Sequence, residues 1–93
     1  MKKYTELQDA ELMVEIPGGQ LIGIVSDVQR GEEREKNFLT VWLITKQKPP
    51  EAGQCWVTFN DERYGAAFSD VMTTEEIFKS KLKTIIPSSA FWE

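Results

Sequence analysis

The side chains that most often carry out proton transfer and metal chemistry are nearly absent from this sequence of 93 residues. It contains no histidine and a single cysteine, Cys55. Histidine is the usual general base and the commonest metal ligand, and one thiol cannot complete a zinc site. We therefore expect a protein that is not an enzyme and that uses no metal and no cofactor.

Acidic side chains are the remaining route to catalysis. Asp27, Asp61, Glu62 and Asp70 could serve a small hydrolase that works with carboxylates alone. Asp61 and Glu62 are neighbours in a turn, and that adjacency does not define a shared site. This alternative predicts two acids that converge in one pocket.

Five residues are the candidates for contact with a protein partner. They are Trp56 in a segment rich in β-formers, Arg63 and Tyr64 in the turn after it, and Phe91 and Trp92 near the end of the sequence. Tyr, Trp and Arg are enriched at the energetic centres of interfaces. A structural role is nevertheless the favoured interpretation of each. Trp56 is expected to pack in the sheet, Arg63 and Tyr64 to form an ordinary turn with a half-buried tyrosine, and Phe91-Trp92 to dock back onto the barrel.

Lysines supply the alternative candidate, a nucleic-acid site. Lys46, Lys48, Lys79 and Lys83 could contact phosphates while aromatic side chains stack on bases. In a helix Lys79 and Lys83 share one face and Lys81 does not. The net charge of −4, from 15 acidic and 11 basic residues, disfavours a protein that binds nucleic acid by charge.

Length and composition predict one globular domain over residues 1–93. The apolar fraction is 41% and the charged fraction is 28%, both ordinary for a folded protein. The lone cysteine favours a reducing compartment, and no apolar stretch approaches the ~20 residues that cross a bilayer. We expect a cytoplasmic protein in which Cys55 is a small core residue.

The first half of the sequence predicts strands. Residues 11–16 alternate in polarity, and Pro17-Gly18 suits a type II turn with positive φ at the glycine. A longer strand over 20–29 follows, with a bulge or bend at Gly23. After a polar loop over 31–37, residues 38–45 are apolar on both faces, which predicts a central strand that contains Trp42 in the core.

The second half predicts two further strands and a helix. Residues 54–60 are rich in β-formers, and 65–71 form a weaker strand. Thr73 and Glu76 have the spacing of a capping box, which predicts a helix over about 74–85 before Pro87 and a tail over 87–93. Thr5 and Gln8 predict a shorter helical turn over about 5–10.

These elements favour a mostly β fold, a small antiparallel SH3-like barrel or rolled sheet of about five strands. The alternative is an α+β roll with the helix across an open sheet. We expect a protein-interaction module, that is an adaptor, inhibitor or assembly subunit, from a bacterium or a mobile element. A protein partner is favoured over nucleic acid, no membrane is expected, and a homodimer is left open.

Overall fold

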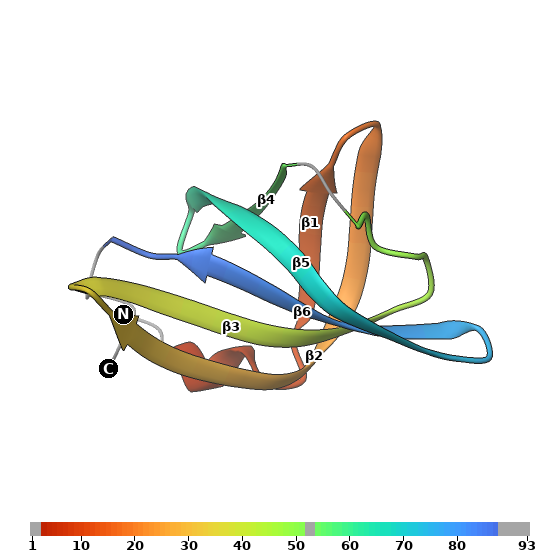
Figure 1. Ribbon diagram of the computed structural model, residues 1–93, viewed down its shortest axis with the longest axis horizontal. Helices are drawn as coiled ribbons and strands as arrows, with labels where there is room; N and C mark the ends of the chain where they lie inside the picture. Colours follow the sequence, from red (N-terminus) through yellow and green to blue (C-terminus); the bar gives the residue numbers. More distant parts are fainter. Residues whose placement is uncertain (1–2, 52–53, 88–93) are drawn as a thin grey trace.

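The computed structural model describes residues 3–51 and 54–87. In this part of the chain six antiparallel strands close into a barrel with the order β1-β2-β3-β6-β5-β4. Figure 1 labels the strands and shows how they curl around a common interior. The elements are η1 (Tyr4–Leu7), β1 (Glu11–Ile16), β2 (Gly19–Glu33), β3 (Lys36–Thr45), β4 (Cys55–Phe59), β5 (Glu62–Thr74) and β6 (Ile77–Ile85). The prediction of a small antiparallel barrel is confirmed, with six strands in place of about five.

Two meanders of the same design form the barrel. In each, a short strand, a long bent strand and a strand of intermediate length are joined by two-residue turns. β1 pairs with β4 and β3 pairs with β6, so each meander closes the other. The longer connection from β3 to β4 places β4 beside β1, which is the strand order of a Greek key.

The turns follow their local chemistry only in part. Gly18 has a φ of +87°, as the predicted turn at Pro17-Gly18 requires. The β2–β3 turn instead uses Arg34 and Glu35, with φ values of 50° and 66°. Two left-handed residues are typical of a type I′ turn, in which Asn and Gly are usual. Because neither is present here, the sequence predicted a polar loop over 31–37 where the two strands in fact continue into the turn.

The predicted helix over 74–85 is wrong, because this segment contains the strand β6. The alternative of an α+β roll required that helix and is therefore wrong as well. Glu75 and Glu76, which resembled a helix start, form the turn between β5 and β6. Along β6 the inward positions include Ser80 and Thr84, and these two polar residues hide the apolar alternation of a strand. β6 pairs with β3 on one side and β5 on the other, and this closure of the sheet overrides local propensity.

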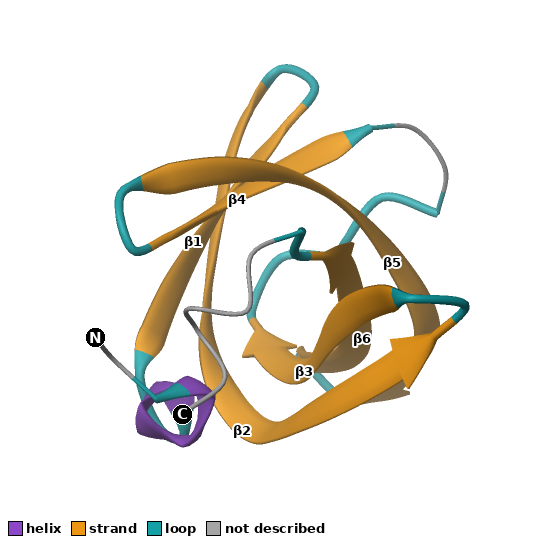
Figure 2. Cartoon of the chain, turned by 90° about the vertical axis from the view of Figure 1, so that its left-hand side faces the viewer, coloured by secondary structure: helices purple, strands orange, loops and turns teal. Residues whose placement is uncertain are grey.

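The predicted turn over 5–10 is found in part as η1, which lies beside β2 (Figure 2). The capping box is not formed, since no side chain caps η1. Gln8 instead donates from Nε2 to the carbonyl oxygen of Ser26 on β2, at 2.6 Å. Within the described residues no helix is long and apolar enough to cross a membrane.

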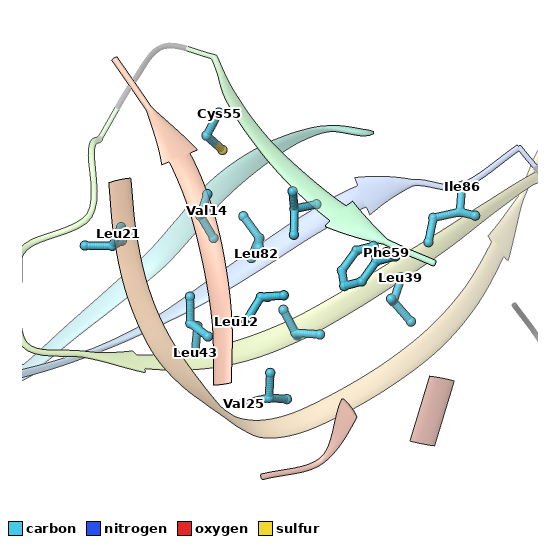
Figure 3. Close-up of a cluster of buried hydrophobic side chains, with 12 residues drawn as sticks. Leu12, Val14, Leu21, Val25, Leu39, Leu43, Cys55, Phe59, Leu82 and Ile86 are labelled. Carbon is cyan, nitrogen blue, oxygen red and sulfur yellow. The ribbon is translucent and has the colours of Figure 1, made fainter. Parts of the chain in front are cut away.

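The core lies inside the barrel, where side chains of both meanders meet (Figure 3). Its buried apolar residues are Leu12, Val14, Leu21, Val25, Leu39, Val41, Leu43, Cys55, Val57, Phe59, Leu82 and Ile86. Cys55 is a core residue as expected, and its thiol donates to the carbonyl oxygen of Ala66 at 2.9 Å. Burial raises the pKa of the Cys55 thiol, which therefore stays protonated near neutral pH.

Gly23 marks a close approach between strands. A Cβ at this position would lie 2.6 Å from Cγ of Leu43 and 2.7 Å from the carbonyl oxygen of Ile44. The bulge of β2 comes later, where the register with β3 shifts between Val25 and Asp27. Gly23 therefore lets β3 press against β2 just where β2 passes from its pairing with β1 to its pairing with β3.

Candidate binding surfaces

The outer surface of the barrel is built from cross-strand rows. Successive side chains of a strand point to opposite faces, so outward residues of adjacent strands stand side by side about 5 Å apart. Three such regions contain the residues suited to binding. They are a Trp56 cluster on β1, β4 and β5, an apolar face on β1, β2, β3 and β6, and a lysine–aromatic face on β3 and β6.

The Trp56 cluster joins two of the predicted partner-binding residues. The Cζ atom of Arg63 lies 4.1 Å from the centroid of the half-buried Trp56 ring. Nη2 of Arg63 is also 3.0 Å from Oε2 of Glu15, which stands opposite Trp56 on β1. The indole covers Gly65, its partner on β5. The guanidinium group of Arg63 and the ring of Trp56 thus already have partners within the chain, although an open groove lies beside them.

Tyr64 points away from Arg63, toward the interior side of β5. Its ring packs partly against the core and lies 6.3 Å from that of Phe59. The hydroxyl donates to Oε2 of Glu62 at 2.6 Å. Burial, together with this hydrogen bond and the charge of Glu62, raises the pKa of Tyr64 to about 12. The structure therefore separates the neighbours Arg63 and Tyr64 onto opposite faces.

The apolar face was not among the predicted sites. It consists of Met13, Ile22, Ile24, Ile44 and Ile77, which are 36–54% exposed. The isoleucines line one groove of about 610 Å³. A signal was present in the sequence, because residues 20–29 and 38–45 are apolar at both alternating positions. That pattern suggested a strand covered on both sides, whereas in this barrel the second apolar side is the outer surface.

Two rows cross the apolar face. In the first, each residue is the register partner of the next: Glu11 on β1, Ile24 on β2, Ile44 on β3 and Lys79 on β6. The row therefore has an acid at one end, a base at the other and two isoleucines between them. The second row begins with the paired Met13 and Ile22 and reaches Lys46 and Ile77 across the groove.

The lysine–aromatic face continues from Lys79 along β6. Because a strand has a period of two, Lys79, Lys81 and Lys83 all point outward, whereas a helix would have separated Lys81 from the other two. Nζ of Lys79 is 5.4 Å from the ring centroid of Trp42, and Nζ of Lys83 is 4.2 Å from that of Phe38.

Two further features of this face modify the predictions. Trp42 is half-buried on the outside of β3, so the expectation that it lies in the core is wrong. Lys81 has an acidic neighbour, because its Nζ is 3.8 Å from Oδ2 of Asp70. The face thus presents three ammonium groups, one of them with a carboxylate beside it.

The other predicted residues are dispersed. Lys46 lines the groove of the apolar face, and Nζ of Lys48 is 3.2 Å from Oε1 of Glu51. Phe91 and Trp92 lie outside the described residues.

The candidate acids of a hydrolase have different partners. Asp27 accepts a hydrogen bond from the backbone N–H of Val28, Glu62 accepts from Tyr64, and Asp70 lies near Lys81. Within residues 3–51 and 54–87, no group of three or more acidic or cysteine side chains could hold a metal ion.

Comparison with known proteins adds no relative. No protein-family model matches the sequence, no curated protein matches it, and no solved structure matches it.

Proposed function

We propose that this protein is a protein-interaction module, serving as an adaptor, inhibitor or assembly subunit, and that it binds its partner through the apolar face. The observation that carries the proposal is the gathering of five exposed large apolar side chains on four adjacent strands. Contiguous exposed apolar surface of this kind marks interaction sites on soluble proteins.

Docking on the apolar face gains its free energy mainly from the apolar surface that a partner removes from water. Removing apolar surface from water contributes about 25 cal/mol for each Å² buried. The side chains of the apolar face are held on hydrogen-bonded strands, so docking a partner there requires little ordering of the backbone. The Trp56 cluster is less suited, because its cation already faces a ring and a carboxylate.

The proposed location is the cytoplasm. The sequence has one cysteine, and its thiol is buried in the core. A protein that forms no disulfide of its own suits a reducing compartment.

A photo-crosslinking experiment in the cells that produce the protein tests this function. A photoreactive phenylalanine derivative in place of the exposed Ile22 should give a discrete protein adduct, and adding Ile24→Lys should abolish it. The matched control places the same probe at Glu33, an exposed residue of β2 near the β2–β3 turn and away from the apolar face. No adduct at position 22, or the same adduct from both positions, would contradict the proposal.

A second candidate function, binding of single-stranded nucleic acid, is favoured by the lysine–aromatic face. Three outward lysines on one strand beside two ring systems offer phosphate contacts and stacking surfaces together. The surface thereby concentrates positive charge on a protein whose net charge is −4.

Fluorescence anisotropy with labelled single-stranded DNA and RNA tests this candidate. Binding at low salt should weaken as salt rises, with a logarithmic slope of about −2 if three phosphates are neutralised. The double variant Lys81→Ala, Lys83→Ala should reduce that slope, whereas Lys48→Ala should leave it unchanged. Absence of binding at low salt would eliminate this function.

A further inference from the structure

The first row of the apolar face is complementary to itself. Its order is Glu11, Ile24, Ile44, Lys79, and adjacent members are register partners on neighbouring strands. A two-fold axis that runs along the strands between Ile24 and Ile44 exchanges the two ends of the row. Each isoleucine of one copy then meets the other isoleucine of the second copy, and each Glu11 meets a Lys79.

Among the described residues the charges at the two ends of the row form no ion pair with each other. Three strand spacings separate Glu11 from Lys79, a distance of about 14 Å between their Cα atoms. Among the described residues neither side chain has an ion-pair partner within 4.0 Å. The ammonium group of Lys79 faces the Trp42 ring at 5.4 Å and remains exposed, so a carboxylate can still reach it.

The second row obeys the same symmetry. The axis brings Met13 of one copy toward Ile77 of the other, and Ile22 toward Lys46. Both apolar ends of this row are thus covered, and the aliphatic stem of a lysine can pack on an isoleucine while its ammonium group stays in water. A protein of unrelated sequence would need to match both rows independently.

We infer that the partner on the apolar face is a second copy of this chain, bound through an isologous two-fold interface in which Glu11 of each copy pairs with Lys79 of the other. This inference rests on the proposed function and names its partner. Two-fold dimers are the commonest symmetric assemblies of soluble proteins, and their interfaces are self-complementary in this way.

The dimer should be a weak one. A stable interface of standard size buries about 800 Å² on each partner. That is about 13% of the accessible surface of the chain, which measures 6063 Å². The apolar face is compact and ends in exposed charges. We expect a dissociation constant on the order of 10 μM, typical of small interfaces with few anchors.

Charge reversal provides the decisive experiment, with sedimentation equilibrium as the readout. The wild-type protein should dimerise over a range from about 1 to 500 μM, a range that brackets this affinity. Glu11→Lys and Lys79→Glu should each weaken the dimer at least tenfold, because like charges then face each other twice. An equimolar mixture of the two variants restores both opposite-charge contacts and should form a heterodimer of wild-type affinity.

The control variant is Glu33→Lys, which changes the net charge as Glu11→Lys does but lies on β2 near the β2–β3 turn, away from the apolar face. It should dimerise as the wild type does. Circular dichroism and melting curves establish that each variant is folded. A wild-type protein that stays monomeric at 500 μM, or a dimer that ignores both charge reversals, would overturn the inference.

The crosslinking experiment distinguishes the dimer from the proposed function, which is binding of any protein partner through the apolar face. An adduct at position 22 that contains a second copy of the chain agrees with both. An adduct with a different protein, together with a monomeric wild type, retains the function and rejects the second copy as partner. No adduct at all rejects the function itself.

Discussion

Two outer rows of this barrel use the same kinds of residue and arrange them differently. Around Trp56, an acid and a base meet over an aromatic ring, with Oε2 of Glu15 and Nη2 of Arg63 3.0 Å apart. In the row from Glu11 to Lys79, two isoleucines lie between the acid and the base, which are three strands apart instead of two. The first row pairs its own charges, whereas in the second row Glu11 and Lys79 form no ion pair among the described residues.

Residue type alone does not tell whether a side chain is engaged within the fold. Trp and Arg are typical interface residues, yet here they stabilise each other across β4 and β5. Isoleucine usually indicates a core, yet Ile22 and Ile24 point outward. What distinguishes the two rows is whether each group finds its partner within the chain.

The largest expected effect is a loss of stability from a substitution at Gly23, between the outward residues Ile22 and Ile24 of the apolar face. Gly23→Ala places a methyl group 2.6 Å from Leu43 and 2.7 Å from backbone of β3, which should cost about 3 kcal/mol of unfolding free energy. Denaturant unfolding measures it. The control is Gly31→Ala, where no atom lies within 4 Å and the change should stay below about 0.5 kcal/mol. Equal losses would show that Gly23 is not at a close approach.

The next effect contrasts the centres of the two rows. Trp56→Ala removes a half-buried ring that covers Gly65 and holds Arg63, at an expected cost of about 2 kcal/mol. Ile24→Ala removes a more exposed side chain and should cost less than about 1 kcal/mol in dilute protein. Thermal unfolding of both variants at low concentration provides the comparison. The reverse order of stabilities would contradict the assignment of the Trp56 cluster to the fold.

Double-mutant cycles sharpen the contrast between the charges. Glu15 and Arg63 should show a coupling of about 0.5 kcal/mol in dilute protein, a modest value because both side chains are exposed. Glu11 and Lys79 should show none there, since they are too far apart. At concentrations where the dimer forms, the second pair should become coupled. A coupling between Glu11 and Lys79 in the monomer would mean that the row satisfies its own charges.

The smallest effect concerns pH and the interior side of β5. The pKa of Tyr64 is raised to about 12, above its ordinary value of 10. The protonated phenol is therefore favoured in the folded state, so its stabilisation is complete below pH 10 and is lost as the pH rises toward 12. Phenolate absorbance during a pH titration should show this late ionisation. It should disappear in Tyr64→Phe and move to lower pH in Glu62→Gln.

The local part of the fold was predictable. Alternating polarity defines β1, a run that is apolar on both faces defines β3, and Pro17-Gly18 specifies the turn after β1. These signals involve residues that are neighbours in the sequence. The same local signals misassigned β6, where Glu75 and Glu76 resemble a helix start. Ser80 and Thr84 are buried on the inner side of β6. Apolar residues at these two positions would have given the alternating pattern of a strand.

The sites were predictable only as residue types. Trp56 and Arg63 were named from their chemistry, but their contact depends on the pairing of β4 with β5. The apolar face was missed, because residues apolar on both sides of a strand suggested burial on both sides.

The sequence by itself determined a chain of short strands and tight turns with few groups able to transfer protons. Only the tertiary structure decided that β6 closes the barrel, that its three lysines share one side, and that isoleucines from β2 and β3 stand together on the outer surface. Polarity and turn chemistry act between neighbours in the sequence. The closure of the barrel instead pairs β1 with β4 and β3 with β6, strands that no tight turn connects, so it depends on residues far apart in the sequence.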